Sequence, residues 1–165
     1  MADNPQRRIS FASVASEEST SSSSSGESVS GWLSDTSTIT RNWFSVTQLK
    51  HVRNLDGSFP VWFHGVMSRD EAVRLLEDQA KGYFLLRVSD TEAKFILSIK
   101  AKEPPDQEVL HYRIRQTKNG NHLVWGESRA HRTILDLIQY YKSNHLSNWN
   151  GLLTEPLHAA EGLHA

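Results

Sequence analysis

The 165-residue chain contains no cysteine. It therefore cannot form a disulfide scaffold, a cysteine-ligated zinc site or a cysteine nucleophile, and its composition fits a reducing cell interior. No apolar run approaches the roughly 20 residues of a membrane span, and the start of the chain lacks the apolar core of a signal peptide. Ala2 stands where N-myristoylation needs a glycine. We expect a cytoplasmic protein without a membrane span, which could also enter the nucleus.

The sequence also lacks a large net charge and recognisable catalytic motifs. The formal net charge is −1 at pH 7, so no overall positive field attracts nucleic acid or an anionic membrane. The sequence has no nucleophile elbow, no glycine-rich phosphate loop and no kinase catalytic motif. Its 8 histidines are scattered, with no pair at metal-binding spacing on one helix. These absences predict a protein that is not an enzyme and that holds no metal or cofactor.

Residues 1–40 are rich in serine and threonine, with an unbroken run of serines at 21–25. Few apolar residues and no periodicity predict a disordered tail, because too little surface can be buried to offset the entropy of ordering. Two arginines shortly precede Ser10, and Ser24 precedes Glu27. We treat Ser10 and Ser24 as candidate phosphosites, although a serine-rich tail also matches such patterns by chance.

A short amphipathic helix and a linker are predicted within residues 41–57. The apolar residues recur at helical spacing: Trp43, Val46, Leu49 and Val52. Thr40 or Asn42 can cap the start, and the polar stretch 54–57 stops the helix. We expect the apolar stripe to pack on the folded domain. The alternative is a separate helix that binds a partner.

The folded domain is predicted over residues 58–157, with a C-terminal tail at 158–165. A short strand near residues 59–65 precedes a helix that starts with a capping box, Ser68 to Glu71, and whose buried stripe is Ala72, Leu75 and Leu76. Four strands and a second helix follow, at 82–89, 95–100, 109–116, 122–125 and 134–141. The short turns between the strands favour hairpins. This order predicts an α+β fold, with a central antiparallel sheet flanked by one helix on each face.

The stretch from Gly82 to Asp90 has the pattern of a buried strand, which Arg87 interrupts. Alternation puts Arg87 and Ser89 on one face, about 6–7 Å apart. That spacing lets a guanidinium and a hydroxyl converge on one tetrahedral anion. The alternative is that Arg87 pairs with an internal Asp or Glu, because buried charges are rarely unpaired. Arg69 opposes the dipole of the preceding helix, which makes sense if an anion docks nearby.

Five motifs in order resemble a Src homology 2 (SH2) domain. They are Trp62-Phe63-His64-Gly65, Ser68-Arg69, Gly82 to Ser89, His111-Tyr112-Arg113-Ile114 and Leu135 to Tyr141. Flanking tracts around Asn42-Trp43-Phe44 and at 152–156 resemble the small hematopoietic SH2 and T-cell-specific adaptor group. The resemblance implies an SH2-like α+β fold and a non-catalytic adaptor. Its implied partners are tyrosine-phosphorylated receptors, scaffolds or kinases in tyrosine-kinase signalling.

The resemblance also implies a phosphotyrosine site made of Arg69, Arg87, Ser89, Thr91, His111 and Arg113. In this family the strand arginine pairs bidentately with the phosphate, the helix arginine contacts it from the side, and a basic residue lines the tyrosine ring. Two departures stand out. Val88 replaces the usual glutamate but points away from Arg87, and the turn 90–93 carries two acids, which implies modest affinity.

The sequence carries fewer signals for peptide specificity, and it leaves an alternative function. Tyr112 occupies a position where family members often carry an aromatic residue under the peptide. Ile114, Trp125 and the loop 143–151 would shape a second pocket for an apolar residue about three positions after the phosphotyrosine, unless Ile114 and Trp125 are core. RNA binding, or a phosphate-independent protein-interaction module, is the alternative function. The near-neutral charge argues against nucleic acid, and the oligomeric state stays open.

Overall fold

A five-stranded sheet forms the centre of the domain, in a computed structural model that describes residues 38–160. The strands neighbour one another in chain order: β1 (Phe63–Met67), β2 (Phe84–Ser89), β3 (Phe95–Lys100), β4 (Val109–Gln116) and β5 (His122–Val124). β2 to β5 form the predicted antiparallel meander, whereas β1 pairs with β2 in parallel. The parallel pair is possible because a crossover containing α4 (Arg69–Leu76) joins β1 to β2.

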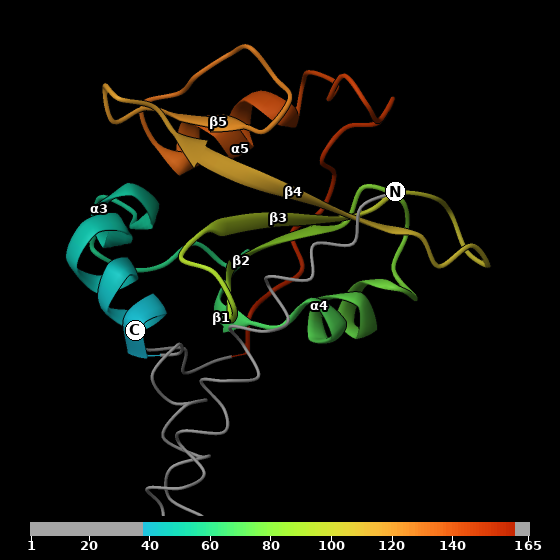
Figure 1. Cartoon of the computed structure of the whole chain (residues 1–165). Coiled ribbons are helices and arrows are strands. Elements are labelled where there is room, and N and C mark those ends of the chain that lie inside the picture. The colour runs from blue at the N-terminus through green and yellow to red at the C-terminus, as the bar shows by residue number, and fades with distance from the viewer. Residues whose placement is uncertain (1–37, 161–165) are drawn as a thin grey trace, which may run out of the picture. The chain divides into compact units, whose positions relative to one another are not determined.

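Two helices cover opposite faces of this sheet, α4 on one and α5 (Ile134–Tyr141) on the other (Figure 1). The smaller group of buried residues joins Ala72 and Leu76 of α4 to Leu85 of β2. The larger group contains the alternate residues of β2, together with the buried side of α5. The predicted α+β sandwich and the alternation along β2 are therefore confirmed. Arg87, two residues after Leu85, lies on the α4 face.

Both long helices start with side-chain caps. The Ser68 hydroxyl accepts a hydrogen bond from the Glu71 N–H at 3.2 Å, and the Glu71 carboxylate accepts one from the Ser68 N–H at 3.0 Å. Thr133 caps α5 by accepting from the Asp136 N–H at 3.1 Å. The predicted stripe of α4 is wrong at Leu75, which is 42% exposed. Leu75 lies about a quarter turn from Leu76 and so points away from the sheet.

The helix before β1 contains a π-helical segment that changes which residues it buries. Residues 38–43 are α-helical and continue into η1 (Phe44–Gln48) and α3 (Leu49–Val52). The buried residues recur every fourth position: Thr40, Phe44, Gln48 and Val52. The predicted stripe is wrong at Val46, which is 81% exposed, and Thr40 lies inside the helix instead of capping it. The wider i to i+5 turn of the π-helix explains the shift.

This helix packs on the sheet, as expected from its apolar stripe. The Phe44 ring stacks on Phe63 with the ring centroids 5.3 Å apart, and it meets Phe95 edge-on at 5.9 Å. Gln48 is buried because its Nε2 donates to Gln116 Oε1 on β4 at 3.2 Å. At the other end of the chain, the Ala159 N–H donates to the Val61 carbonyl at 2.8 Å. Contacts therefore join both the preceding helix and the start of the following segment to the domain predicted at residues 58–157.

Some predictions concern residues that the structure does not describe. Residues 1–37 of the predicted serine-rich tail, with Ser10 and Ser24, lie outside residues 38–160, as do positions 161–165. The last three residues of that predicted tail, 38–40, are instead helical. Among the helices of residues 38–160, none is both long and apolar enough to cross a bilayer.

Candidate functional site

Arg87 is a buried cation that has no carboxylate partner among residues 38–160. Every residue of β2 is buried, and Arg87 is only 4% exposed. Its Nε donates to Ser98 Oγ at 3.3 Å, and its Nη1 donates to the Met67 carbonyl at 2.9 Å. No carboxylate of residues 38–160 forms an ion pair with it. The alternative of an internal Asp or Glu partner is therefore wrong for the described part of the chain.

The two hydrogen bonds fix the guanidinium and leave most of its donors unused. A guanidinium carries five N–H groups, and within the described part of the chain only the two bonds to Ser98 and Met67 engage it. Burial lowers the pKa of Arg87, the charge of Asp90 raises it, and Arg69 lowers it. The group nonetheless stays charged at neutral pH. It is a preorganised cation whose remaining donors suit a forked pair with an oxyanion.

Ser98 connects Arg87 to His111 on the neighbouring strands. Ser98 Oγ lies 2.9 Å from His111 Nδ1 while it accepts from Arg87. If the single Ser98 proton points to Nδ1, the His111 tautomer carries its proton on Nε2. His111 Nε2 is buried and has no hydrogen-bond partner among residues 38–160. The chain of bonds thus presents a second fixed polar group on the face that carries Arg87.

Arg69 contributes to the same positive region from α4. Its side chain is exposed in the first turn of the helix. Burial first, then the charges of Arg69 and Arg87, lower the pKa of His111 to about 4. His111 is therefore neutral near pH 7, because its burial, and then the two nearby cations, oppose its protonation. An anion bound among Arg69, Arg87 and His111 would offset the repulsion between the two arginines.

The turn after β2 is built around Ser89. Its hydroxyl oxygen accepts from the N–H groups of Thr91 and Glu92 at 3.3 and 3.2 Å, and it lies 3.3 Å from the Thr91 hydroxyl. Thr91 itself is exposed. The turn therefore closes on the Ser89 side chain, at the end of the strand that carries Arg87.

Glu92 in this turn partly neutralises two cations. Its carboxylate lies 3.0 Å from Lys94 Nζ and 3.8 Å from Arg113 Nη2. A hydrogen bond from Lys94 and the charges of Arg113 and Lys94 lower the pKa of Glu92. The acid does not point away from the site, and it competes with any incoming anion for Arg113.

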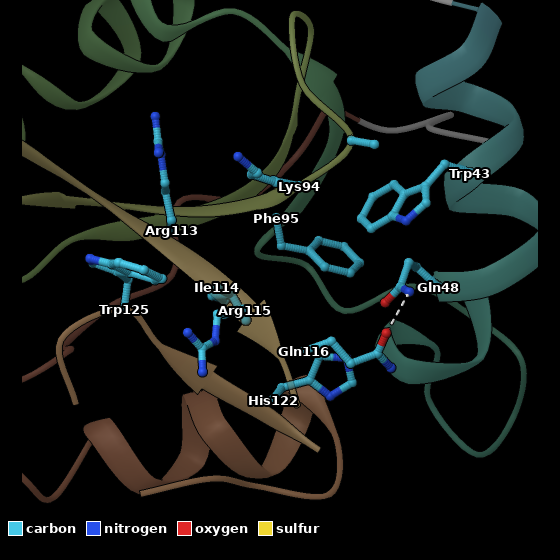
Figure 2. Close-up of a pocket in the computed structure, with 11 residues that line it drawn as sticks. Trp43, Gln48, Lys94, Phe95, Arg113, Ile114, Arg115, Gln116, His122 and Trp125 are labelled. Atoms are coloured by element: carbon cyan, nitrogen blue, oxygen red, sulfur yellow. Dashed lines mark hydrogen bonds between the residues drawn. The ribbon is translucent and has the colours of Figure 1, made fainter. Parts of the chain in front are cut away.

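A hollow opens where β4 runs past the start of β3, and we call it the notch. Its volume is about 380 Å³, and its side chains come from the helix before β1, from the turn before β3 and the start of β3, from β4, and from β5 with the residue that follows it (Figure 2). Those used below include Trp43, Gln48, Lys94, Gln116, His122 and Trp125.

The notch contains two of the three predicted specificity residues. Ile114 is 5% exposed and belongs to the main core, so it is core as well as lining. Trp125 is 59% exposed and is not core. The predicted loop 143–151 supplies no lining residue, because its Ser147 is instead hydrogen-bonded to Glu127. Tyr112 lies apart from the notch and packs, half-buried, against the main core.

The comparisons with known proteins agree with this architecture. The family model for the SH2 domain matches residues 62–141. The chain carries an SH2 domain. SH2 domain-containing protein 2A of Mus musculus is 36% identical over 118 residues, which cover 72% of this chain and 30% of that protein. The hematopoietic SH2 domain-containing protein of Homo sapiens is 34% identical over 115 residues, which cover 70% of this chain and 31% of that protein. The resemblance to the hematopoietic SH2 group is confirmed, and the chain spans less than a third of these curated relatives.

Solved structures show the same SH2 fold. The VAV1 SH2 domain, complexed with a tyrosine-phosphorylated peptide from SLP76, superposes with a TM-score of 0.51 at 26% identity, over 68% of this chain and 80% of that one. The SH2 domain of a CRK/CRKL homologue from Monosiga brevicollis gives a TM-score of 0.52 at 24% identity, over 61% and 89% of the two chains. At that identity the second likeness shows the fold alone.

Several residues that build the Arg87 site and the notch were not recognised from the sequence. Ser98 sits inside an apolar strand pattern, where nothing signals that it bridges Arg87 and His111. Lys94 follows a predicted turn, and its positive charge was the signal in the sequence for a place beside the anion site. Trp43 and Gln48 line the notch from a helix that precedes the matched segment 62–141. Within residues 38–160, no three His, Asp or Glu side chains come together in a way that could hold a metal ion.

Proposed function

We propose that the SH2 domain of this chain binds phosphotyrosine-containing peptides, and that the protein works as a non-catalytic adaptor in cytoplasmic tyrosine-kinase signalling. The observation that carries the proposal is Arg87, a buried guanidinium held by two hydrogen bonds and paired with no carboxylate of residues 38–160. A phosphate supplies the missing negative charge and fits the forked donor geometry. The complex of the matched VAV1 domain with a tyrosine-phosphorylated peptide supports this choice of ligand.

The proposed phosphate seat lies between α4 and β4. Arg87 binds the phosphate from β2, Arg69 binds it from the first turn of α4, and the His111 ring on β4 lies beside it. Ser89 and Thr91 remain proposed donors from the turn, and Arg113 lies at the rim. Because Arg87 is only 4% exposed, a ligand must reach it with a long stem. Phosphoserine and phosphothreonine are too short for this, so an arginine cluster at this depth selects phosphotyrosine.

The proposal is tested by fluorescence anisotropy on the full chain with three matched peptide pools. The pools carry phosphotyrosine, phosphoserine or unmodified tyrosine at a fixed position. We expect binding of the phosphotyrosine pool alone, with the shallow salt dependence of a single phosphate contact. Equal binding of all three pools would contradict the proposal. A steep salt dependence with a single-stranded RNA of similar length would favour the alternative of RNA binding.

Removing the acid next to the site is expected to tighten phosphopeptide binding. In the Glu92→Gln variant, Arg113 and Lys94 lose the carboxylate that lies 3.8 and 3.0 Å from them. Both cations then face the phosphate without competition, and we expect an affinity gain of about twofold to fivefold, in the range of exposed ion pairs. Asp78→Gln, at an exposed position outside the site, is the matched control and should leave the affinity unchanged. Weaker binding by the Glu92→Gln variant would show that Glu92 supports the seat.

A further inference from the structure

Two histidines from distant parts of the chain meet on the face of the sheet opposite Arg87. His51 lies in α3, at the end of the helix before β1, and His122 is the first residue of β5. Their ring centroids are 4.7 Å apart. His122 pairs with Gln116, which lies two residues after Ile114 of the main core, so His122 points to the face that α5 covers. The histidine pair is therefore separate from the proposed phosphate seat.

The His122 ring is buried with both of its nitrogens unsatisfied. It is 1% exposed, and neither Nδ1 nor Nε2 has a hydrogen-bond partner among residues 38–160. A neutral imidazole carries one N–H donor and one acceptor nitrogen, and leaving both unpaired in the interior costs free energy. Burial first, and then the charge of His51, lower the pKa of His122 to about 4. The ring is therefore neutral near pH 7, which is the form that ligates a metal ion.

The backbone of Arg132 lies near the His122 ring. Although no hydrogen bond is formed, it is close enough to raise the pKa of His122, against the larger effect of burial. A hydrogen-bonding group has that effect when it is an acceptor, because an acceptor favours the protonated ring. Ligating histidines commonly donate their second N–H to a backbone carbonyl, which fixes the tautomer. Arg132 is thus placed to orient His122 while the other ring nitrogen binds an ion.

The spacing of the two rings fits a shared zinc ion. Zinc binds imidazole nitrogens at about 2.0–2.1 Å in tetrahedral geometry, which puts the centres of two bound rings about 5 Å apart. The observed 4.7 Å is close to that value. The rings are inclined by 61°. His51 is half-buried, and the χ2 torsion of histidine is broad, so its ring can turn a nitrogen towards the ion.

Oxygen ligands can complete the coordination of such an ion. No third His, Asp or Glu joins the pair within residues 38–160. His122 lines the notch together with Gln48 and Gln116 (Figure 2). Gln48 lies three residues before His51, so the two side chains share one side of the helix. Amide oxygens and water in the notch are therefore available, and we expect weaker binding than in a zinc site with four protein ligands.

We propose that His51 and His122 form a zinc-binding site that joins the helix before β1 to β5. One ring nitrogen of each histidine binds the ion, and the notch supplies the oxygen ligands. The spacing rules that exclude a metal site in the sequence compare histidines on one helix, whereas this pair spans two elements. The site needs the helix that precedes the matched residues 62–141, so zinc attaches that helix to the SH2 domain. It does not depend on the proposed function.

Isothermal titration calorimetry of the chelator-treated full chain with zinc chloride measures the binding, and thermal unfolding measures the attachment. We expect one zinc ion per chain, and a rise in Tm of about 4–6 °C when the zinc concentration is about ten times the Kd. His51→Gln changes a half-buried position and should fold. It should weaken zinc binding at least about tenfold, because even the outer partners of a metal ligand are worth that much. His145→Gln, at an exposed position outside the notch, should bind zinc as the wild type does.

Nitrogen NMR spectra of the histidine rings identify the ligands directly. Zinc should shift one ring nitrogen of His51 and one of His122 in step with the calorimetric curve. Equal zinc affinity of the wild type and the His51→Gln variant would show binding at other histidines only, and would overturn the proposal. A titration without heat and without a change in Tm would also overturn it. Zinc that lowers the Tm would show preferential binding to the unfolded chain, against a site built by the fold.

Discussion

The Arg87→Met variant is expected to lose phosphotyrosine binding while its free domain becomes more stable. Arg87 is 4% exposed and has no carboxylate partner among residues 38–160. Burial of such a charge carries a penalty of several kcal/mol, which hydrogen bonds to Ser98 and Met67 offset in large part. Methionine fills similar volume without the charge, so we expect the free energy of unfolding to rise by about 1 kcal/mol. Loss of the phosphate pair should weaken binding by at least about 2 kcal/mol, or thirtyfold.

Denaturant unfolding and peptide anisotropy on the same preparations measure both effects. Arg87→Lys is the control, because it keeps the charge and loses the fork. We expect it to lose at least about tenfold in affinity with no gain in stability. A methionine variant that unfolds more easily would mean that Arg87 supports the fold itself. One that binds phosphopeptide as the wild type does would remove Arg87 from the site.

The Phe44→Ala variant is expected to lose about 3–4 kcal/mol of stability, as for a buried phenylalanine. The Phe44 ring contacts Phe63 and Phe95 and is 6% exposed. Val46→Ala, on the same helix at an 81% exposed position, should change stability by less than about 0.5 kcal/mol. Urea unfolding of the full chain compares the two. Similar small effects would mean that the helix before β1 is only loosely attached, and that Trp43 and Gln48 do not form a fixed wall of the notch.

Local signals explain why much of the domain was predictable. The alternation around Arg87, the capping box at Ser68 and the cap at Thr133 each involve residues close in sequence, and the structure has all three. The turn at Asn119-Gly120 is also local, with Gly120 at a φ of 82°. Such features need no knowledge of the rest of the fold, and the motif order then sufficed to indicate the family.

The features that the sequence did not reveal arise where distant residues decide the structure. The parallel partner of β1 lies beyond α4, so no turn in the sequence announces it. Gln48 is buried because of a bond to Gln116, 68 positions away, which hydrophobic spacing cannot show. The π-helical segment then moved the buried face away from Val46. The notch depends on these same contacts, so it could not be predicted from the chain alone.

The most direct test of the account follows the side-chain N–H of Arg87 by NMR. Its Nε–H is fixed by Ser98 Oγ at 3.3 Å in a buried position, so its signal should be visible in the free domain. On titration with a singly phosphorylated tyrosine peptide, we predict a shift of this signal that saturates with the binding curve. The unphosphorylated peptide should leave it in place. A phosphopeptide that binds while the Arg87 signal stays unchanged would contradict the assignment of Arg87 as the phosphate ligand.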